Sequence, residues 1–283
     1  MSVITLSRVS KTFGRKTVLH DIELEVGEGE MVGLIGASGS GKSTLIRLVC
    51  GLERMDRGAA GRIALFGQET QADGRFSAQA EARRGDVGVI FQQFNLVNRL
   101  SLLTNVLAGR LGRVARWRGT LGLFPHADRV AALRALERVG LIDQTHQRAS
   151  TLSGGQQQRG AIARVLTQQA RLILADEPIA SLDPASARLV MSMLREINRQ
   201  DRTTVIVSLH QIDHAFEHCD RIIALKEGRV IHNGPTTDIT PDDIADLYGI
   251  EAGSLDLVKA RPASKPAAAA PRPARAARVL ATA

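Results

Sequence analysis

The chain has 283 residues, 44% of them hydrophobic and 3% aromatic, with a formal net charge of +8, so it is long enough to bury one large core or two modest ones. Neither the N-terminal MSVITLSRVSKTF nor any later stretch has the apolar run of a signal peptide or a membrane span, which predicts a chain that does not itself cross a membrane. The two cysteines, Cys50 and Cys219, lie far apart and exclude a disulfide framework or a cysteine-based metal site.

Strand-like and helix-like segments alternate along the first third of the chain. Short apolar segments bounded by Gly, Asp and Lys predict strands at Ile4–Val9, Leu19–Val26, Met31–Ile35, Arg62–Phe66 and Val87–Phe91. A helix with one apolar face is expected at Ser43–Gly51. The earliest strands are expected to pair as an antiparallel set.

The middle of the chain changes to helical spacing, and the alternation then resumes. Apolar residues recur every three or four positions from Leu96 to Leu141, which predicts a mostly helical subdomain inserted at about 95–165. Further strands are predicted at Arg171–Asp176, Thr203–Leu209 and Arg221–Leu225. Strands separated by helices imply a parallel sheet covered on both faces, so the predicted fold class is α/β.

A glycine-rich loop follows the third predicted strand. Its sequence GASGSGKS matches the pattern G-x-x-x-x-G-K-[ST] and comprises Gly36, Ala37, Ser38, Gly39, Ser40, Gly41, Lys42 and Ser43. The glycines let successive backbone N–H groups turn toward phosphate oxygens. We expect Lys42 to reach the β- and γ-phosphates of ATP, Ser43 to bind Mg²⁺ through its hydroxyl, and Thr44 to add a contact near the α-phosphate.

Polar residues end three of the predicted core strands. The apolar run LILAD ends in Asp176, whose carboxylate is expected to bind Mg²⁺ at the carboxyl edge of the sheet. Glu177 follows directly and is a candidate general base for the attacking water. His210 ends the strand TTVIVSL and is expected to contact the γ-phosphate and orient Glu177. Gln92 follows the strand VGVIF and is expected to reach Mg²⁺ or the water.

A second anion-binding pattern lies more than a hundred residues downstream. The segment LSGGQ at 152–156 places Ser153, Gly154, Gly155 and Gln156 at the start of a predicted helix. Unpaired N–H groups and the helix dipole favour a negative ligand at such a tip. Together with the phosphate loop, LILADEP, the Ser181–Asp183 turn and His210, this segment resembles the ATP-binding subunits of ABC transporters over roughly residues 3–235.

The resemblance implies a composite site in a homodimer. It makes residues 1–250 a P-loop nucleotide-binding domain with an N-terminal antiparallel β subdomain and the inserted helical subdomain. In such proteins two subunits pair head to tail, so Ser153, Gly154 and Gly155 would cap the γ-phosphate that the partner binds. Asp183 would lie across the same seam, and Phe13 falls where the family stacks the adenine ring.

The flanking segments are similar to one branch of this family. FQQFNLVNRLSLLTNVL at 91–107 and STLSGGQQQR at 150–159 resemble the ATP-binding subunits of phosphonate importers. This resemblance implies membrane permease subunits that dock on residues 93–110, a periplasmic phosphonate-binding protein, and a position at the cytoplasmic face of the inner membrane. Gly160 departs from the family pattern, in which a larger residue is usual. Transport direction and cargo rest on resemblance alone, so an ABC ATPase for another cargo stays open.

The tail at 259–283, within the C-terminal extension 251–283, accounts for most of the net charge. Residues 259–283 hold six basic residues and no acidic one, which leaves only +2 of the total +8 for the rest of the chain. Their Ala/Pro/Arg-rich composition predicts a disordered tail. Few aromatic residues are present for base stacking, and the interval between the phosphate loop and LSGGQ lacks sustained heptads, so a nucleic-acid partner is not expected.

Overall fold

The computed structural model describes residues 1–58 and 60–249, and of Arg116 it describes the backbone alone. The predicted extension at 251–283, with its basic tail at 259–283, lies outside these residues. Within the described part of the chain, no helix has the length and apolarity that crossing a membrane requires.

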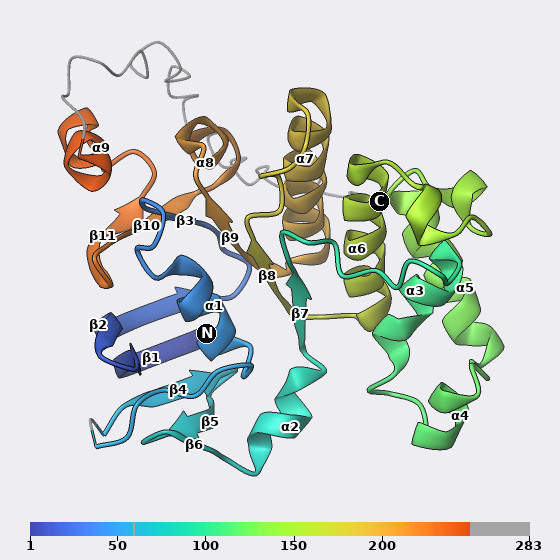
Figure 1. The fold of residues 1–283 in the computed structure, drawn as a ribbon, viewed down its shortest axis with the longest axis horizontal. Helices are drawn as coiled ribbons and strands as arrows, with labels where there is room; N and C mark the ends of the chain where they lie inside the picture. Colours follow the sequence, from blue (N-terminus) through green and yellow to red (C-terminus); the bar gives the residue numbers. More distant parts are fainter. Residues whose placement is uncertain (59, 250–283) are drawn as a thin grey trace, which may run out of the picture.

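The N-terminal part forms an antiparallel sheet with the strand order β2-β1-β4-β5-β6, as predicted for its first strands (Figure 1). Its strands are β1 (Ser2–Phe13), β2 (Lys16–Gly27), β4 (Arg62–Leu65), β5 (Gln68–Ala72) and β6 (Arg75–Phe76). The first two strands are longer than predicted because their pairing continues to the hairpin end, where Phe13 lies opposite Lys16. A short helix, α2 (Gln79–Arg84), leads out of this sheet.

The second sheet has six strands in the order β11-β10-β3-β9-β8-β7. Its strands are β3 (Met31–Ile35), β7 (Val87–Ile90), β8 (Leu172–Asp176), β9 (Thr204–Leu209), β10 (Arg221–Lys226) and β11 (Arg229–Pro235). All neighbours pair in parallel except β10 and β11. Every residue of β3, β8 and β9 is buried, which confirms the α/β class with a sheet covered on both faces.

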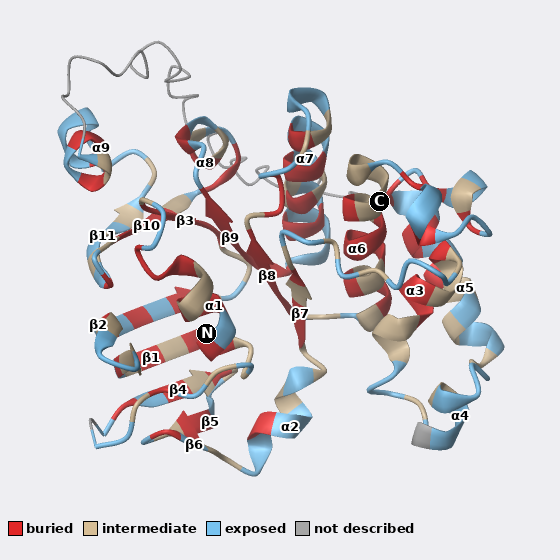
Figure 2. Ribbon diagram, viewed as in Figure 1, coloured by how far each residue is buried: buried red, intermediate tan, exposed pale blue. Residues whose placement is uncertain are grey.

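Two hydrophobic cores lie on the two faces of this sheet. Along β3, Met31 and Ile35 join one core, whereas Val32 and Leu34 join the other, because successive strand side chains point to opposite faces. The first core contains the helical part of the chain, and the second contains the antiparallel sheet and the first helix. Figure 2 shows buried residues concentrated in the central strands and on the inward sides of the helices.

The helices other than α2 fall into two groups. The first group, which accompanies the sheets, consists of α1 (Lys42–Val49), α7 (Pro184–Asp201), α8 (Ile212–His218) and α9 (Pro241–Tyr248). The second group lies between β7 and β8 in the sequence and is drawn in green on the right of Figure 1. It comprises α3 (Leu102–Leu107), α4 (Arg116–Thr120), α5 (His126–Arg138) and α6 (Gly154–Gln168). Short 3-10 turns lie at Ala108–Arg110, Ile142–Gln144 and Ala149–Thr151. A mostly helical segment therefore follows β7, where the sequence predicts one.

Gly160 permits a close approach within the helical group. It lies inside α6, where a glycine costs about 1 kcal/mol relative to alanine. A Cβ at this position would lie 2.8 Å from Leu102 Cδ1 and 3.3 Å from Leu96 Cδ1. Because Leu102 is fully buried, the glycine offsets its helix cost by letting α3 pack tightly on α6.

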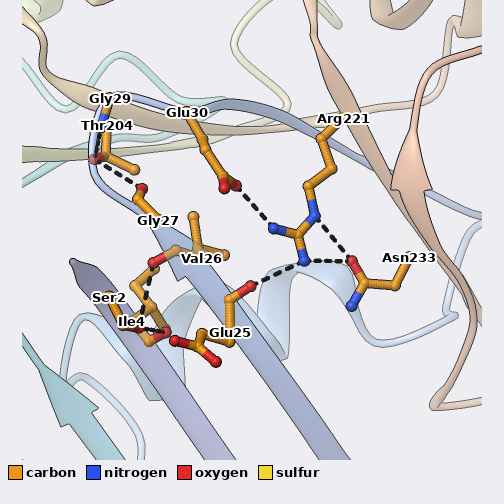
Figure 3. Close-up of polar contacts among 10 residues, drawn as sticks. All are labelled: Ser2, Ile4, Glu25, Val26, Gly27, Gly29, Glu30, Thr204, Arg221 and Asn233. Carbon is orange, nitrogen blue, oxygen red and sulfur yellow. Dashed lines mark hydrogen bonds and ion pairs between the residues drawn. The ribbon is translucent and has the colours of Figure 1, made fainter.

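Arg221 joins the two sheets by side-chain hydrogen bonds (Figure 3). From β10, its guanidinium donates to Glu30 Oε2 at 2.9 Å and to the backbone oxygen of Glu25 on β2 at 3.0 Å. It also donates to Asn233 Oδ1 on β11 from two nitrogens, at 3.0 and 2.7 Å. The fixed fork of arginine suits such a set of divergent acceptors, and it holds the antiparallel sheet against the edge of the parallel one.

Candidate nucleotide-binding site

The phosphate loop connects β3 to α1, which is the strand–loop–helix context that the motif requires. Gly36 has φ 151° and Gly41 has φ 107°, both in the region that favours glycine. A Cβ at Gly36 would lie 2.7 Å from Ser40 Oγ, and one at Gly41 would lie 2.6 Å from Leu19 Cδ2. The loop therefore needs glycine at these positions for both its backbone conformation and its close packing.

Lys42 is the first residue of α1 and is buried. Its Nζ donates to the backbone oxygens of Gly36 at 2.7 Å and of Ala37 at 3.1 Å, so the side chain folds back over its own loop. Burial lowers the pKa of the Lys42 ammonium, while the nearby carboxylates of Glu177 and Asp176 raise it. The loop thus holds the Lys42 ammonium at its centre, where it and the backbone N–H groups would both contact negatively charged phosphates.

Asp176 is the centre of a hydrogen-bonded group at the carboxyl edge of the parallel sheet. Its Oδ1 accepts from Ser43 Oγ at the start of α1 and from Ser208 Oγ on β9, each at 2.9 Å. Ser208 Oγ also accepts from the backbone N–H of Glu177 at 2.8 Å. The parallel register of β8 and β9, which pairs Asp176 with Ser208, brings these groups together.

Ser208 is the residue of this group that the sequence patterns do not single out. It is fully buried, and it links the orientation of Asp176 to the backbone of Glu177. The available signal is a single hydroxyl residue in the otherwise apolar end of the strand VIVSL, which alone is too weak to indicate a site.

Glu177 and His210 form a contact next to this group. The Nε2 of His210 lies 2.5 Å from Oε1 of Glu177. Glu177 has φ 48°, a backbone conformation that costs about 1 kcal/mol for a residue other than glycine. Such strain concentrates at functional positions, where the surrounding hydrogen bonds hold it in place. Two of the three predicted catalytic residues, Glu177 and His210, therefore lie together, beside Asp176, which is one of the predicted metal ligands.

The donor set at this edge fits Mg²⁺. The hydroxyl of Ser43 and the carboxylate of Asp176 are hard oxygen ligands of the kind that Mg²⁺ prefers. Gln92 is exposed and lies two residues after β7, which pairs in parallel with β8, so it follows a strand end at the same sheet edge. Among the described residues, no hydrogen bond joins Gln92 to Ser43 or Asp176. The structure brings two of the three predicted metal ligands into contact.

The LSGGQ segment forms the capped beginning of α6. Ser153 Oγ accepts from Gln156 N at 3.3 Å, and Gln156 Oε1 accepts from Ser153 N at 2.9 Å, which together make a capping box. A Cβ at Gly155 would lie 2.7 Å from Ser186 Oγ, and Gly154 lies near Phe94. In Figure 1, α6 lies beside α3 and α5, whereas α1 lies beside the antiparallel sheet on the other side of β7 and β8. One copy of the chain therefore does not place its LSGGQ tip at its own phosphate loop.

The two remaining predicted contacts are exposed. Asp183 caps α7, where its carboxylate accepts from the N–H groups of Ala185 and Ser186 at 3.0 Å. Hydrogen bonds from the Ser186 side chain and backbone lower the pKa of Asp183. Phe13 ends β1 with 46% of its surface exposed, and Lys11 Nζ lies 4.7 Å from its ring centroid. An exposed aromatic face with an adjacent cation is a suitable surface for stacking a nucleotide base.

The comparisons with known proteins agree with this geometry. Residues 19–180 match the family described as ABC transporter. A phosphonates import ATP-binding protein, PhnC, of Stutzerimonas stutzeri is 57% identical over 250 residues, which are 88% of this chain and 91% of that protein. A protein of the same description from Caulobacter vibrioides is 51% identical over 249 residues, 88% of this chain and 94% of that protein.

A solved structure adds the dimeric form of a similar protein. The ATP-binding cassette MJ0796, in a dimeric post-hydrolysis state bound to ADP and Pi, is 32% identical and has a TM-score of 0.69. The similarity covers 82% of this chain and 98% of that one. The phosphate loop, the carboxylate edge and the capped LSGGQ helix thus occur in a chain whose relatives are ATP-binding cassettes. The chain belongs to the ABC transporter family.

Proposed function

We propose that this chain is the ATP-hydrolysing subunit of an ABC importer for phosphonates. The observation that carries the proposal is the continuous hydrogen-bonded group that links Ser43, Asp176, Ser208 and the Glu177 backbone, with His210 in contact with the Glu177 carboxylate. The phosphonate cargo is supported by relatives that are more than half identical to the chain and are described as phosphonate import proteins.

ATP binding would use the phosphate loop and Phe13. The N–H groups of Gly36 to Thr44 would surround the phosphates, and the adenine ring would stack on Phe13. Lys42 would exchange its bonds to the Gly36 and Ala37 oxygens for the β- and γ-phosphate oxygens, a change that replaces neutral acceptors with charged ones. Ser43, Asp176 and Gln92 would hold Mg²⁺, which supplies charge neutralisation at the phosphates when it is bound.

Hydrolysis would depend on Glu177 and His210. Water attacks the γ-phosphorus, its proton passes to the Glu177 carboxylate, and the bond to the β-phosphate oxygen breaks to give ADP and phosphate. His210 would orient Glu177 through the observed contact and donate a hydrogen bond to the γ-phosphate. Ser208 would act as a positioning residue, because it fixes both the Asp176 oxygen and the Glu177 backbone.

The site would be completed by a second copy of the chain. Ser153 caps α6, and Gly154 and Gly155 place backbone N–H groups in its first turn. We expect Ser153, Gly154 and Gly155, at this positive end of the helix dipole, to cap the γ-phosphate held by the other copy. Gln156 fixes this tip through the capping box, and Asp183 would lie across the same seam. Two such shared sites make closure of the dimer dependent on ATP, and hydrolysis would allow it to reopen.

Transport requires partners that this chain does not supply. The helical segment that starts near Gln92 would receive a cytoplasmic loop of the membrane permease on residues 93–110, at the inner face of the membrane. A periplasmic phosphonate-binding protein would deliver the cargo to the permease. Opening and closing of the ATPase dimer would then move the helical segments and, with them, the permease.

Reconstitution would test the proposed cargo. The chain would be assembled in liposomes with its permease and binding protein, and ATP hydrolysis would be followed with methylphosphonate, phosphite, a phosphate ester or an amino acid. We expect hydrolysis to rise with the phosphonate and not with the amino acid, and to be lost in Glu177→Gln. Stimulation by another cargo class alone would contradict the proposed substrate while leaving the ATPase assignment intact.

A further inference from the structure

Helix α8 carries a cluster of metal-binding side chains that the nucleotide site does not use. The helix follows β9 and packs against β3, β9 and α7. Its sequence IDHAFEH places His214, Glu217 and His218 at positions i, i+3 and i+4. Residues at these spacings share one face of a helix, and two histidines four apart on such a face are a known pattern for zinc ligands.

The side chains lie close enough to share one ion after small rotations. One ligand atom from each of the three residues lies within 4.8 Å of the other two. The rings of His214 and His218 are stacked, with centroids 6.0 Å apart and 20° between their planes. Glu217 Oε2 lies 3.6 Å from His218 Nε2.

Two ring nitrogens of this cluster are buried without a hydrogen-bond partner. Among the residues that the structure describes, none forms a hydrogen bond with His214 Nδ1 or His218 Nε2. His218 is only 8% exposed, so solvent reaches it poorly. Because the great majority of buried polar atoms in proteins are paired, these two nitrogens indicate a ligand that accepts electron pairs from both. The Cys219 thiol is not part of the set, because its Sγ faces Gly33 of β3.

The charges around the cluster are compatible with a cation. The cluster lies at the C-terminal end of α8, where the helix dipole is negative. Burial, together with the charges of His214 and Arg195, lowers the pKa of the His218 imidazole. Glu217 opposes this shift, and the Arg195 charge is balanced by two hydrogen bonds to the Asp220 carboxylate.

We propose that His214, Glu217 and His218 form a binding site for one divalent transition metal ion of the zinc class. Two imidazoles and one carboxylate suit Zn²⁺, Co²⁺ or Ni²⁺, whereas Mg²⁺ and Ca²⁺ prefer oxygen ligands alone. The fourth position would be taken by water. This site is separate from the Mg²⁺ site predicted at Ser43 and Asp176, and it does not depend on the proposed cargo.

Cobalt binding to the purified, chelator-stripped full chain would test the site in the absence of nucleotide. Co²⁺ would be titrated while its visible absorption is recorded, and Zn²⁺ would then be added as a competitor. We expect one equivalent of Co²⁺ to give the absorption of a low-coordinate site, and Zn²⁺ to displace it. In His214→Gln we expect the dissociation constant to rise by at least about tenfold, since even the loss of an outer-sphere partner of a metal ligand costs this much.

Matched variants separate this site from the other histidines. Glu217 is exposed, so Glu217→Gln removes one ligand without disturbing the core, and it should also weaken binding. His146→Gln changes an exposed histidine elsewhere, and His210→Gln removes the imidazole of the nucleotide site; both should bind Co²⁺ as the unmodified chain does. The proposal would be overturned if His214→Gln bound Co²⁺ as tightly as the unmodified chain does. It would also be overturned if only His210→Gln lost Co²⁺ binding, or if the unmodified chain bound no stoichiometric Co²⁺.

Discussion

Replacing Ser208 by alanine should separate catalysis from folding. The Ser208→Ala change removes the hydroxyl that donates to Asp176 Oδ1 and accepts from Glu177 N, at 2.9 and 2.8 Å. A hydrogen bond to a charged group contributes about 1.5–3 kcal/mol. If the loss of this hydrogen bond raises the free energy of the transition state by the same amount, kcat should decrease about 10- to 100-fold. The affinity for ATP should change little, because the phosphate loop is untouched.

A matched variant on the same strand controls for stability. Thr204 is also fully buried on β9, and its hydroxyl accepts from Gly29 N at 2.9 Å, away from the nucleotide site. Thr204→Val keeps the shape of the side chain and leaves that N–H unpaired, at a cost of about 1–3 kcal/mol in the free energy of unfolding. Phosphate release at saturating ATP and denaturant unfolding would be measured for both variants.

The comparison of the two variants decides the role of Ser208. We expect similar losses of stability and a loss of kcat in Ser208→Ala only, with partial recovery in Ser208→Thr, which restores a hydroxyl. A Ser208→Ala chain with unchanged kcat, or with a decrease no larger than that of Thr204→Val, would refute the positioning role.

Three further changes test the fold. Arg221→Met should lower the free energy of unfolding by about 1–3 kcal/mol in denaturant titrations, because the two sheets lose a shared donor, whereas the exposed Arg62→Met should change it by less than about 0.5 kcal/mol. Gly160→Leu should destabilise the chain by about 1–3 kcal/mol in the same assay, since its side chain would meet Leu102. Burial raises the pKa of the Cys219 thiol to about 12, so the stability that the thiol contributes is full below pH 9 and is lost as the pH rises toward 12. Raising the pH from 8 to 10 should therefore lower the free energy of unfolding by about 1 kcal/mol more in the unmodified chain than in Cys219→Ala. An equal decrease in the two chains would contradict the buried thiol.

The parts of the site that were predictable are those encoded by contiguous residues. The loop from Gly36 to Ser43 carries its glycines, lysine and serine in one stretch, and the contact of Asp176 with Ser43 follows from the rule that parallel strands end at one edge. The same rule predicts the Glu177–His210 contact, because these residues follow the neighbouring parallel strands β8 and β9. Such patterns are local, so no knowledge of the packing is needed to find them.

The features that escaped prediction depend on register and packing. Ser208 becomes part of the site only because β8 and β9 pair Asp176 with Ser208, a match between residues that are distant in the sequence. The benefit of Gly160 is visible only when Leu102 lies against it. The strands β5 and β6 and the helix α2 are short and largely polar, and so they carry no hydrophobic period.

The mass of an ATP-loaded, hydrolysis-deficient chain tests the shared nucleotide site most directly. Glu177→Gln would be mixed with ATP and Mg²⁺ and its mass measured by light scattering during size-exclusion chromatography, alone and combined with Ser153→Arg. We predict a dimer for Glu177→Gln and a monomer for the double variant, since the arginine would block the α6 tip where the second γ-phosphate binds. A monomer at saturating ATP, or a dimer that Ser153→Arg leaves intact, would contradict a site built from two copies of the chain.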